Sequence, residues 1–144
     1  MSAAQQRPGG KVRELLVGKR TLSSVISVKS GDSLLQAVRL MHVYGVSQLP
    51  VTVDGAVIGS LDEDVVMRRL YEGVDPAAEK VEAVMTDPLP QVDEDEDIEH
   101  IYVALVSGAP GIVVTRDDRP VGLITRIDLL AFWSFGQNAF SYQI

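Results

Sequence analysis

A threonine and an aspartate three residues apart, Thr125 and Asp128, are the side chains of this sequence best placed to act together. They follow an apolar run that contains Gly122, and the helical pattern of residues 125–135 begins at the threonine. Residues three apart on a helix lie on the same side of it. The free N–H groups of a first helical turn favour an anion, and a carboxylate beside them can accept hydrogen bonds from two neighbouring hydroxyls.

Two interpretations of this motif stay open. In the first, Gly122 at the end of a strand lets the backbone approach a ligand closely, and Arg126 and Arg119 add positive charge that suits phosphate. In the second, Thr125 and Asp128 form a capping box, in which the hydroxyl and the carboxylate satisfy N–H groups at the helix start. The glycine and the duplicated hairpin that precedes the motif favour the ligand site.

The stretch that leads to the motif occurs twice in the chain. Residues 49–59 and 112–122 align without gaps, and each consists of two apolar runs separated by a short polar turn and ending in glycine. The first turn is Asp54-Gly55, and Asp-Gly between β-rich runs is a strong hairpin signal. The repeat therefore predicts two β-hairpins, each followed by a helix.

A further helix and a short strand are expected before each hairpin. The first helix begins at Asp32 or Ser33 and ends at Gly45. The second has its apolar face formed by Ile98, Ile101, Tyr102 and Leu105. The strands are predicted at 25–28 and 89–92, and the helices after the hairpins at 62–71 and 125–135. The fold class is therefore α/β, with two pseudo-symmetric β-α-β-β-α repeats.

The repeats define the expected domain organisation. A half of this size buries too little surface to be stable alone, so we expect the halves to pack sheet to sheet as one module, share one core and leave a cleft between them. The predicted ranges are 1–10 for a flexible tail, 11–73 for the first repeat, 74–80 for the linker, 81–136 for the second repeat and 137–144 for an aromatic C-terminal tail. Phe140 and Tyr142 of that tail would be exposed unless they dock.

Composition excludes several classes of protein. The chain has 144 residues and a net charge of −7, which disfavours a nucleic-acid or anionic-membrane binder. No apolar run is long enough to span a membrane, and the polar N-terminus is not a signal peptide. The absence of cysteine removes disulfides and thiolate chemistry and fits a cytoplasmic location.

Other polar residues predict neither a metal site nor catalysis. The acidic run of residues 93–97 lacks the glycine-punctuated spacing of a calcium loop and is expected to be a solvated helix start. His42 and His100 have no metal-ligand spacing and are interpreted as structural or surface residues. A small hydrolase would need a nucleophile–base constellation, and none is recognisable.

Three segments resemble the recurring signatures of cystathionine-beta-synthase (CBS) domains. They are Val84-Met85-Thr86, residues 45–51 and residues 121–130. The resemblance covers about residues 11–136 as a tandem pair, and the segment 107–111 together with 125–130 looks closest to the regulatory region of cystathionine beta-synthase. That closer resemblance would place a catalytic domain, dependent on pyridoxal phosphate, upstream in a longer enzyme.

The resemblance implies a regulatory binding module without catalytic residues, metal or required cofactor. Such pairs bind S-adenosylmethionine, AMP, ADP or ATP, form homodimers and regulate an attached or partner enzyme. The ligand site it implies in the second repeat consists of Gly122, Ile124, Thr125, Arg126, Ile127 and Asp128. The adenine is expected between Leu89 and the opposite repeat's Val46, Ser47, Gln48 and Leu49.

The first repeat departs from the signature. Asp62 stands where the second copy has its threonine, and Val65 where it has its aspartate. With Glu63 and Asp64 beside it, Asp62 would repel a phosphate. We therefore expect one competent site in each chain. The alternative is a protein-interaction or dimerisation module with a vestigial cleft, which would bind no adenosine-type ligand.

Overall fold

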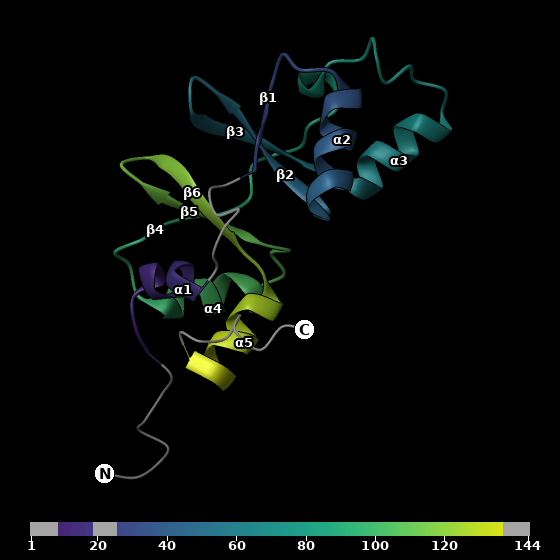
Figure 1. The fold of residues 1–144 in the computed structure, drawn as a ribbon. Helices are drawn as coiled ribbons and strands as arrows, with labels where there is room; N and C mark the ends of the chain where they lie inside the picture. The colour runs from purple at the N-terminus through teal and green to yellow at the C-terminus, as the bar shows by residue number, and fades with distance from the viewer. Residues whose placement is uncertain (1–8, 19–25, 137–144) are drawn as a thin grey trace, which may run out of the picture. The chain divides into compact units, whose positions relative to one another are not determined.

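The computed structural model of the protein describes residues 9–18 and 26–136. Two similar halves each contain the order strand, helix, strand, strand, helix, as predicted (Figure 1). The elements are α1 (Val12–Gly18), β1 (Val28–Lys29), α2 (Leu34–Tyr44), β2 (Gln48–Val53), β3 (Ala56–Asp62), α3 (Glu63–Tyr71), the 3-10 helix η2 (Val81–Ala83), β4 (Gln91–Asp93), α4 (Ile98–Val106), β5 (Ile112–Arg116), β6 (Arg119–Ile124) and α5 (Arg126–Phe135). Within these ranges no helix has the length and apolar character needed to cross a bilayer.

Both predicted hairpins are confirmed. Strands β2 and β3 are joined at Asp54 and Gly55, whose φ angles are 50° and 84°. Strands β5 and β6 are joined at Asp117 and Asp118, with φ angles of 53° and 62°. Positive φ at both central residues matches the right-handed twist of the flanking strands, and aspartate tolerates this conformation better than most residues.

Each half forms its own three-stranded sheet with the same topology. The orders are β1-β2-β3 and β4-β5-β6. The first strand of each sheet pairs in parallel with the second, which pairs antiparallel with the third. The register shifts at equivalent points, between Val51 and Thr52 and between Val114 and Thr115. The internal repeat is therefore preserved down to an irregularity in the hairpin.

The predicted helix boundaries follow from their caps. Ser33 is the N-cap of α2 and accepts a hydrogen bond from the Gln36 N–H at 3.1 Å. Gly45 ends that helix in the left-handed conformation, φ 64°, which glycine adopts without a Cβ clash. In α4 the predicted apolar face is correct except for Tyr102, which is 45% exposed. Tyr102 lies at the edge of that face, where its ring stacks on Trp133 with the centroids 5.8 Å apart.

The first strands of the repeats are shorter than predicted. Only Val28 and Lys29 find partners on β2, so β1 begins where the predicted strand 25–28 ends. Strand β4 begins at Gln91 rather than at 89. Val25, the predicted tail up to residue 8 and the aromatic tail 137–144 lie outside the described residues.

The chain divides into two compact units, and one of them combines an N-terminal segment with the C-terminal half of the chain. Unit 1 comprises residues 1–25 and 90–144, and unit 2 comprises residues 26–89. Each unit has its own apolar core, and the expectation of a core shared between the two halves stays a prediction. Val12 and Leu15 of α1 lie in the core of unit 1, whereas Val81 and Val84 lie in that of unit 2. The segment that leads into each repeat thus completes the core of the other repeat.

These leading segments are fastened by equivalent hydrogen bonds. The Val12 N–H donates to the Glu96 carbonyl at 2.8 Å in unit 1, and the Val81 N–H donates to the Asp32 carbonyl at 2.9 Å in unit 2. The next N–H groups along the two segments also correspond. Arg13 donates to the Glu94 carbonyl in unit 1, and Glu82 donates to the Ser30 carbonyl in unit 2. Helix α1, which the sequence patterns did not predict, is therefore the counterpart of η2.

Candidate functional site

The candidate site lies where β6 passes into α5. Ile124 ends the strand with its side chain fully buried, and Thr125 is the N-cap of the helix in an extended conformation. The Asp128 Oδ2 atom accepts hydrogen bonds from the Thr125 N–H at 2.9 Å and from the Thr125 hydroxyl at 3.1 Å. The two residues form a capping box. The structure thus brings the two predicted central residues into direct contact.

This arrangement fixes a buried carboxylate at a helix N-terminus. Asp128 is only 7% exposed, and the two donors on Thr125 hold its orientation. A carboxylate has two oxygens and about four lone-pair directions, so one carboxylate can accept from several donors at once. The capping role and the ligand role are therefore compatible, and the cap pre-orients the group that a ligand would use.

The flanking residues of the motif have distinct environments. The Arg126 guanidinium donates to the Leu105 carbonyl at 2.7 Å and so ties the start of α5 to the end of α4. That contact gives Arg126 a structural role in addition to the charge that we expected to favour phosphate. Ile127 is 69% exposed on the first turn of α5, where it is accessible as an apolar contact.

Gly122 has a packing reason to be glycine. A Cβ built at this position would overlap the Leu16 Cδ2 atom and would lie 3.6 Å from Leu16 Cγ. The close approach expected at this glycine is therefore made by the side chain of α1. The equivalent Gly59 is covered in the same way, because a Cβ there would lie 2.8 Å from Met85 Sδ.

The other predicted site residues belong to unit 2. Leu49 is fully buried in the core of that unit, and Val46 packs against the same core. The Ser47 carbonyl accepts from the Glu63 N–H at 3.0 Å. The Gln48 Oε1 atom is buried and has no hydrogen-bond partner among residues 9–18 and 26–136. Such an orphaned acceptor is rare in a folded protein. Leu89 is 9% exposed.

The corresponding junction of the first repeat, where β3 passes into α3, lacks the threonine–aspartate pair. Asp62 is the N-cap of α3, and its carboxylate accepts from the Val65 N–H at 2.9 Å. Val65 packs against the apolar core of its unit. Glu63 and Asp64 add two acidic groups to the first turn. The predicted capping role of Asp62 is confirmed, and this turn offers carboxylates to solvent where the second repeat has a threonine and a buried aspartate.

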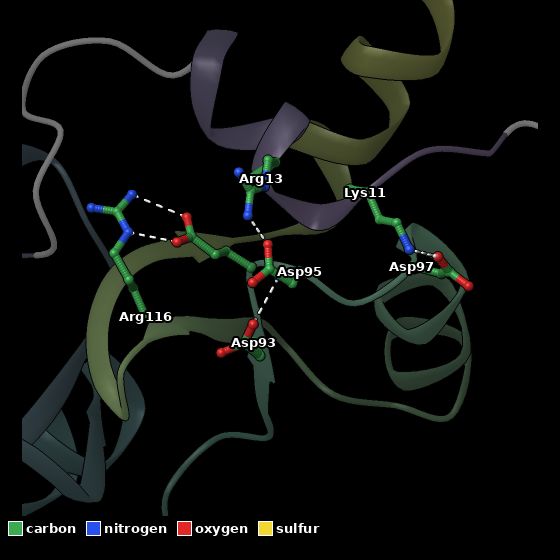
Figure 2. Close-up of polar contacts among 7 residues, drawn as sticks. Lys11, Arg13, Asp93, Asp95, Asp97 and Arg116 are labelled. Atoms are coloured by element: carbon green, nitrogen blue, oxygen red, sulfur yellow. Dashed lines mark hydrogen bonds and ion pairs between the residues drawn. The ribbon is translucent and has the colours of Figure 1, made fainter.

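The acidic run is an ion-pair cluster rather than only a solvated helix start (Figure 2). Lys11 binds Asp97 at 2.7 Å, and Arg13 pairs with Asp95. These cations come from α1 and the residue before it, so sequence patterns within 93–97 could not reveal them. In the part of the chain that the structure describes, no group of acidic or histidine side chains could hold a metal ion.

Glu94 makes a two-point contact with Arg116. The Arg116 Nε and Nη2 atoms donate to its two carboxylate oxygens at 2.6 and 3.0 Å. This hydrogen bonding lowers the pKa of Glu94 and raises the pKa of Arg116. The neighbouring Glu96 accepts from the Asp93 N–H and from His100, and these bonds lower its pKa too.

We expect the contribution of Glu94 to stability to depend on pH. Because its pKa is lowered by folding, the contribution is present above the unfolded value near 4.5 and is lost as the pH falls through the folded value. The Glu94→Gln protein should unfold at lower urea concentration than wild type at pH 7, and the difference should shrink below pH 4.5. The exposed Glu82→Gln is the control. A difference independent of pH would show that charge pairing is not its cause.

The chain is similar to known proteins in both sequence and fold. The CBS domain family model matches residues 12–72 and 81–134. Inosine-5′-monophosphate dehydrogenase of Methanocaldococcus jannaschii is 28% identical over 123 residues, which are 82% of this chain and 23% of the relative. The chain therefore spans about a quarter of the length of that curated relative.

Two solved structures share the fold. The CBS domain structure of NE2398 has a TM-score of 0.72 and 25% identity, and the match covers 85% of this chain and 96% of that one. The CBS domain pair of MJ0100, solved in complex with 5′-methylthioadenosine and S-adenosyl-L-methionine, has a TM-score of 0.65 and 20% identity, with 84% and 97% covered.

Proposed function

The chain belongs to the CBS domain family as a tandem pair, and we propose that its second repeat binds an adenosine-containing ligand and thereby regulates an attached or partner enzyme. The observation that carries the proposal is the buried carboxylate of Asp128, which Thr125 holds at the N-terminus of α5. The ligand class is S-adenosylmethionine, AMP, ADP or ATP.

Asp128 would accept hydrogen bonds from the two ribose hydroxyls. Both hydroxyls are donors on adjacent carbons, and one carboxylate can accept from the pair. The first-turn N–H groups of α5 would face the phosphate or the carboxylate of the ligand, where the helix dipole favours negative charge. Ile127 would supply an apolar contact, and the fully buried Ile124 would support Thr125 from the core.

The expected adenine contacts, Val46, Ser47, Gln48, Leu49 and Leu89, stay a prediction. The orphaned Gln48 Oε1 atom supports this assignment, because the exocyclic amine of adenine is a donor that could satisfy it. Leu49 lies in the core and would act by supporting Val46 and Gln48 rather than by direct contact. The complex of the MJ0100 domain pair with two adenosyl compounds supports the ligand class by analogy.

Regulation would follow from differential affinity for two states of the pair or of its dimer. The dehydrogenase relative, of which this chain matches a quarter, supports a setting in which a CBS pair accompanies a catalytic domain. A homodimer and a cytoplasmic location are part of this proposal.

Calorimetric titration of the protein with S-adenosylmethionine, AMP, ADP and ATP tests the function. We expect saturable binding of at least one of them at one site per chain, because only the second repeat has the threonine–aspartate pair. Two sites per chain would contradict the asymmetry. No heat and no thermal stabilisation with any of the four would favour the other candidate function.

That candidate is an interaction module with a vestigial cleft. The observation that favours it is the apolar surface on α4 and α5, where Val106, Ile127 and Leu130 are all more than half exposed. Exposed apolar residues on adjoining helices are typical of protein–protein interfaces. Sedimentation analysis would detect self-association through this surface, with and without the four compounds.

A further inference from the structure

Helix α1 packs against the strand that leads into the candidate site. Leu16 covers Gly122, which lies three residues before Thr125. Gly122 and Ile124 point to the same face of β6 because side chains alternate along a strand. Ile124, Val12 and Leu15 belong to one apolar core, and Leu16 packs against it.

The same helix also packs against α5, whose first turn carries Asp128. Leu129, the next residue on that helix, shares the core with Val12 and Leu15. Helix α1 therefore touches β6 and α5, the two elements that meet at Thr125.

Helix α1 is held in place by charge and by backbone hydrogen bonds. Figure 2 shows Lys11 directed at Asp97 and Arg13 directed at Asp95. These four side chains are all more than half exposed, so salt screens their attraction. The N–H groups of Val12 and Arg13 donate to the Glu96 and Glu94 carbonyls, both at 2.8 Å.

We infer that Leu16 is a positioning residue for the ligand site: docking of α1 on Gly122 sets the affinity of Thr125 and Asp128 for ligand. The inference rests on the proposed function and adds how ligand binding at this site would be regulated. Because α1 precedes β1 in the chain yet packs on β6 and α5, a change in the position of α1 would be transmitted to the site in the second repeat. Coupling is reciprocal, so ligand would also strengthen the docking of α1.

The test compares variants of two equivalent leading segments. Leu16→Ala removes the contact on Gly122, whereas Met85→Ala removes the matched contact on Gly59 in the first repeat. The probes are S-adenosylmethionine, AMP, ADP and ATP, titrated by calorimetry. We expect Leu16→Ala to weaken binding by about 5-fold or more, Leu16→Met to restore it, and Met85→Ala to leave it unchanged.

Hydrogen exchange gives a second readout, which remains available if the Leu16→Ala protein does not fold. We expect a saturating probe to slow exchange of the Val12 and Arg13 amides in wild type, and Arg13→Gln to speed their exchange and weaken probe binding. Equal affinity in wild type, Leu16→Ala and Arg13→Gln, or equal loss in Met85→Ala, would overturn this inference alone. Failure of wild type to bind any of the four would overturn the proposed function, and this inference with it.

Discussion

Replacement of Asp128 with alanine is expected to weaken binding of the adenosine-type ligand by roughly 100-fold or more. A hydrogen bond to a charged group contributes about 1.5–3 kcal/mol, and two ribose hydroxyls would lose their common acceptor. Asp128 is buried and held by two bonds from Thr125, and α5 has no second carboxylate that could replace it. Titration of the variant with S-adenosylmethionine, AMP, ADP and ATP measures the loss.

The fold of the Asp128→Ala protein should survive. The lost cap costs about 1 kcal/mol, which thermal unfolding would register as a small shift. The matched control is Asp62→Ala, which removes the carboxylate cap of α3 and should leave ligand binding intact. Asp128→Asn keeps the shape and one acceptor, and its affinity should fall between those of wild type and Asp128→Ala. Unchanged binding in Asp128→Ala would show that the box is only a helix cap.

The sequence predicted those features whose causes are local. The first hairpin turn is Asp-Gly and the second is Asp-Asp. Both turns need positive φ, which these residues adopt at lower cost than most others. Ser33 and Gly45 marked the ends of α2 for equally local reasons. Thr125 and Asp128 were predicted to act together because a three-residue spacing on a helix brings side chains into contact, and the structure joins them directly.

Features with distant causes were not predictable from pattern alone. Helix α1 has only seven residues, and isolated helices so short are unstable without packing. Its packing partners, such as Ile98 and Ile124, lie about 80 residues or more away in the sequence. For the same reason the acidic run predicted exposed charge, since its partners Lys11 and Arg13 lie about 80 residues or more away in the sequence. Gly122 was interpreted as a point of ligand approach because Leu16 was not expected above it.

Leu15→Ala is expected to destabilise the protein by about 2–5 kcal/mol, the usual cost of truncating a buried leucine. Leu15 is 3% exposed and belongs to the core that contains Ile98, Ile112 and Leu129 of the second repeat. On the same helix, Val17 is 66% exposed, so Val17→Ala is the matched control and should change stability by less than about 0.5 kcal/mol. Urea unfolding at pH 7 compares the two.

A large difference between these variants would show that α1, which precedes β1, is part of the core formed by the second repeat. The physical reason is that a repeat of this size cannot exclude water from both faces of its strands and helices with its own residues. The exchange of leading segments supplies the missing side chains in both directions, Val12 and Leu15 in one and Val81 and Val84 in the other. Equal stability of Leu15→Ala and Val17→Ala would mean that α1 contributes little to the core. It would also remove the physical basis for coupling α1 to the site at Thr125.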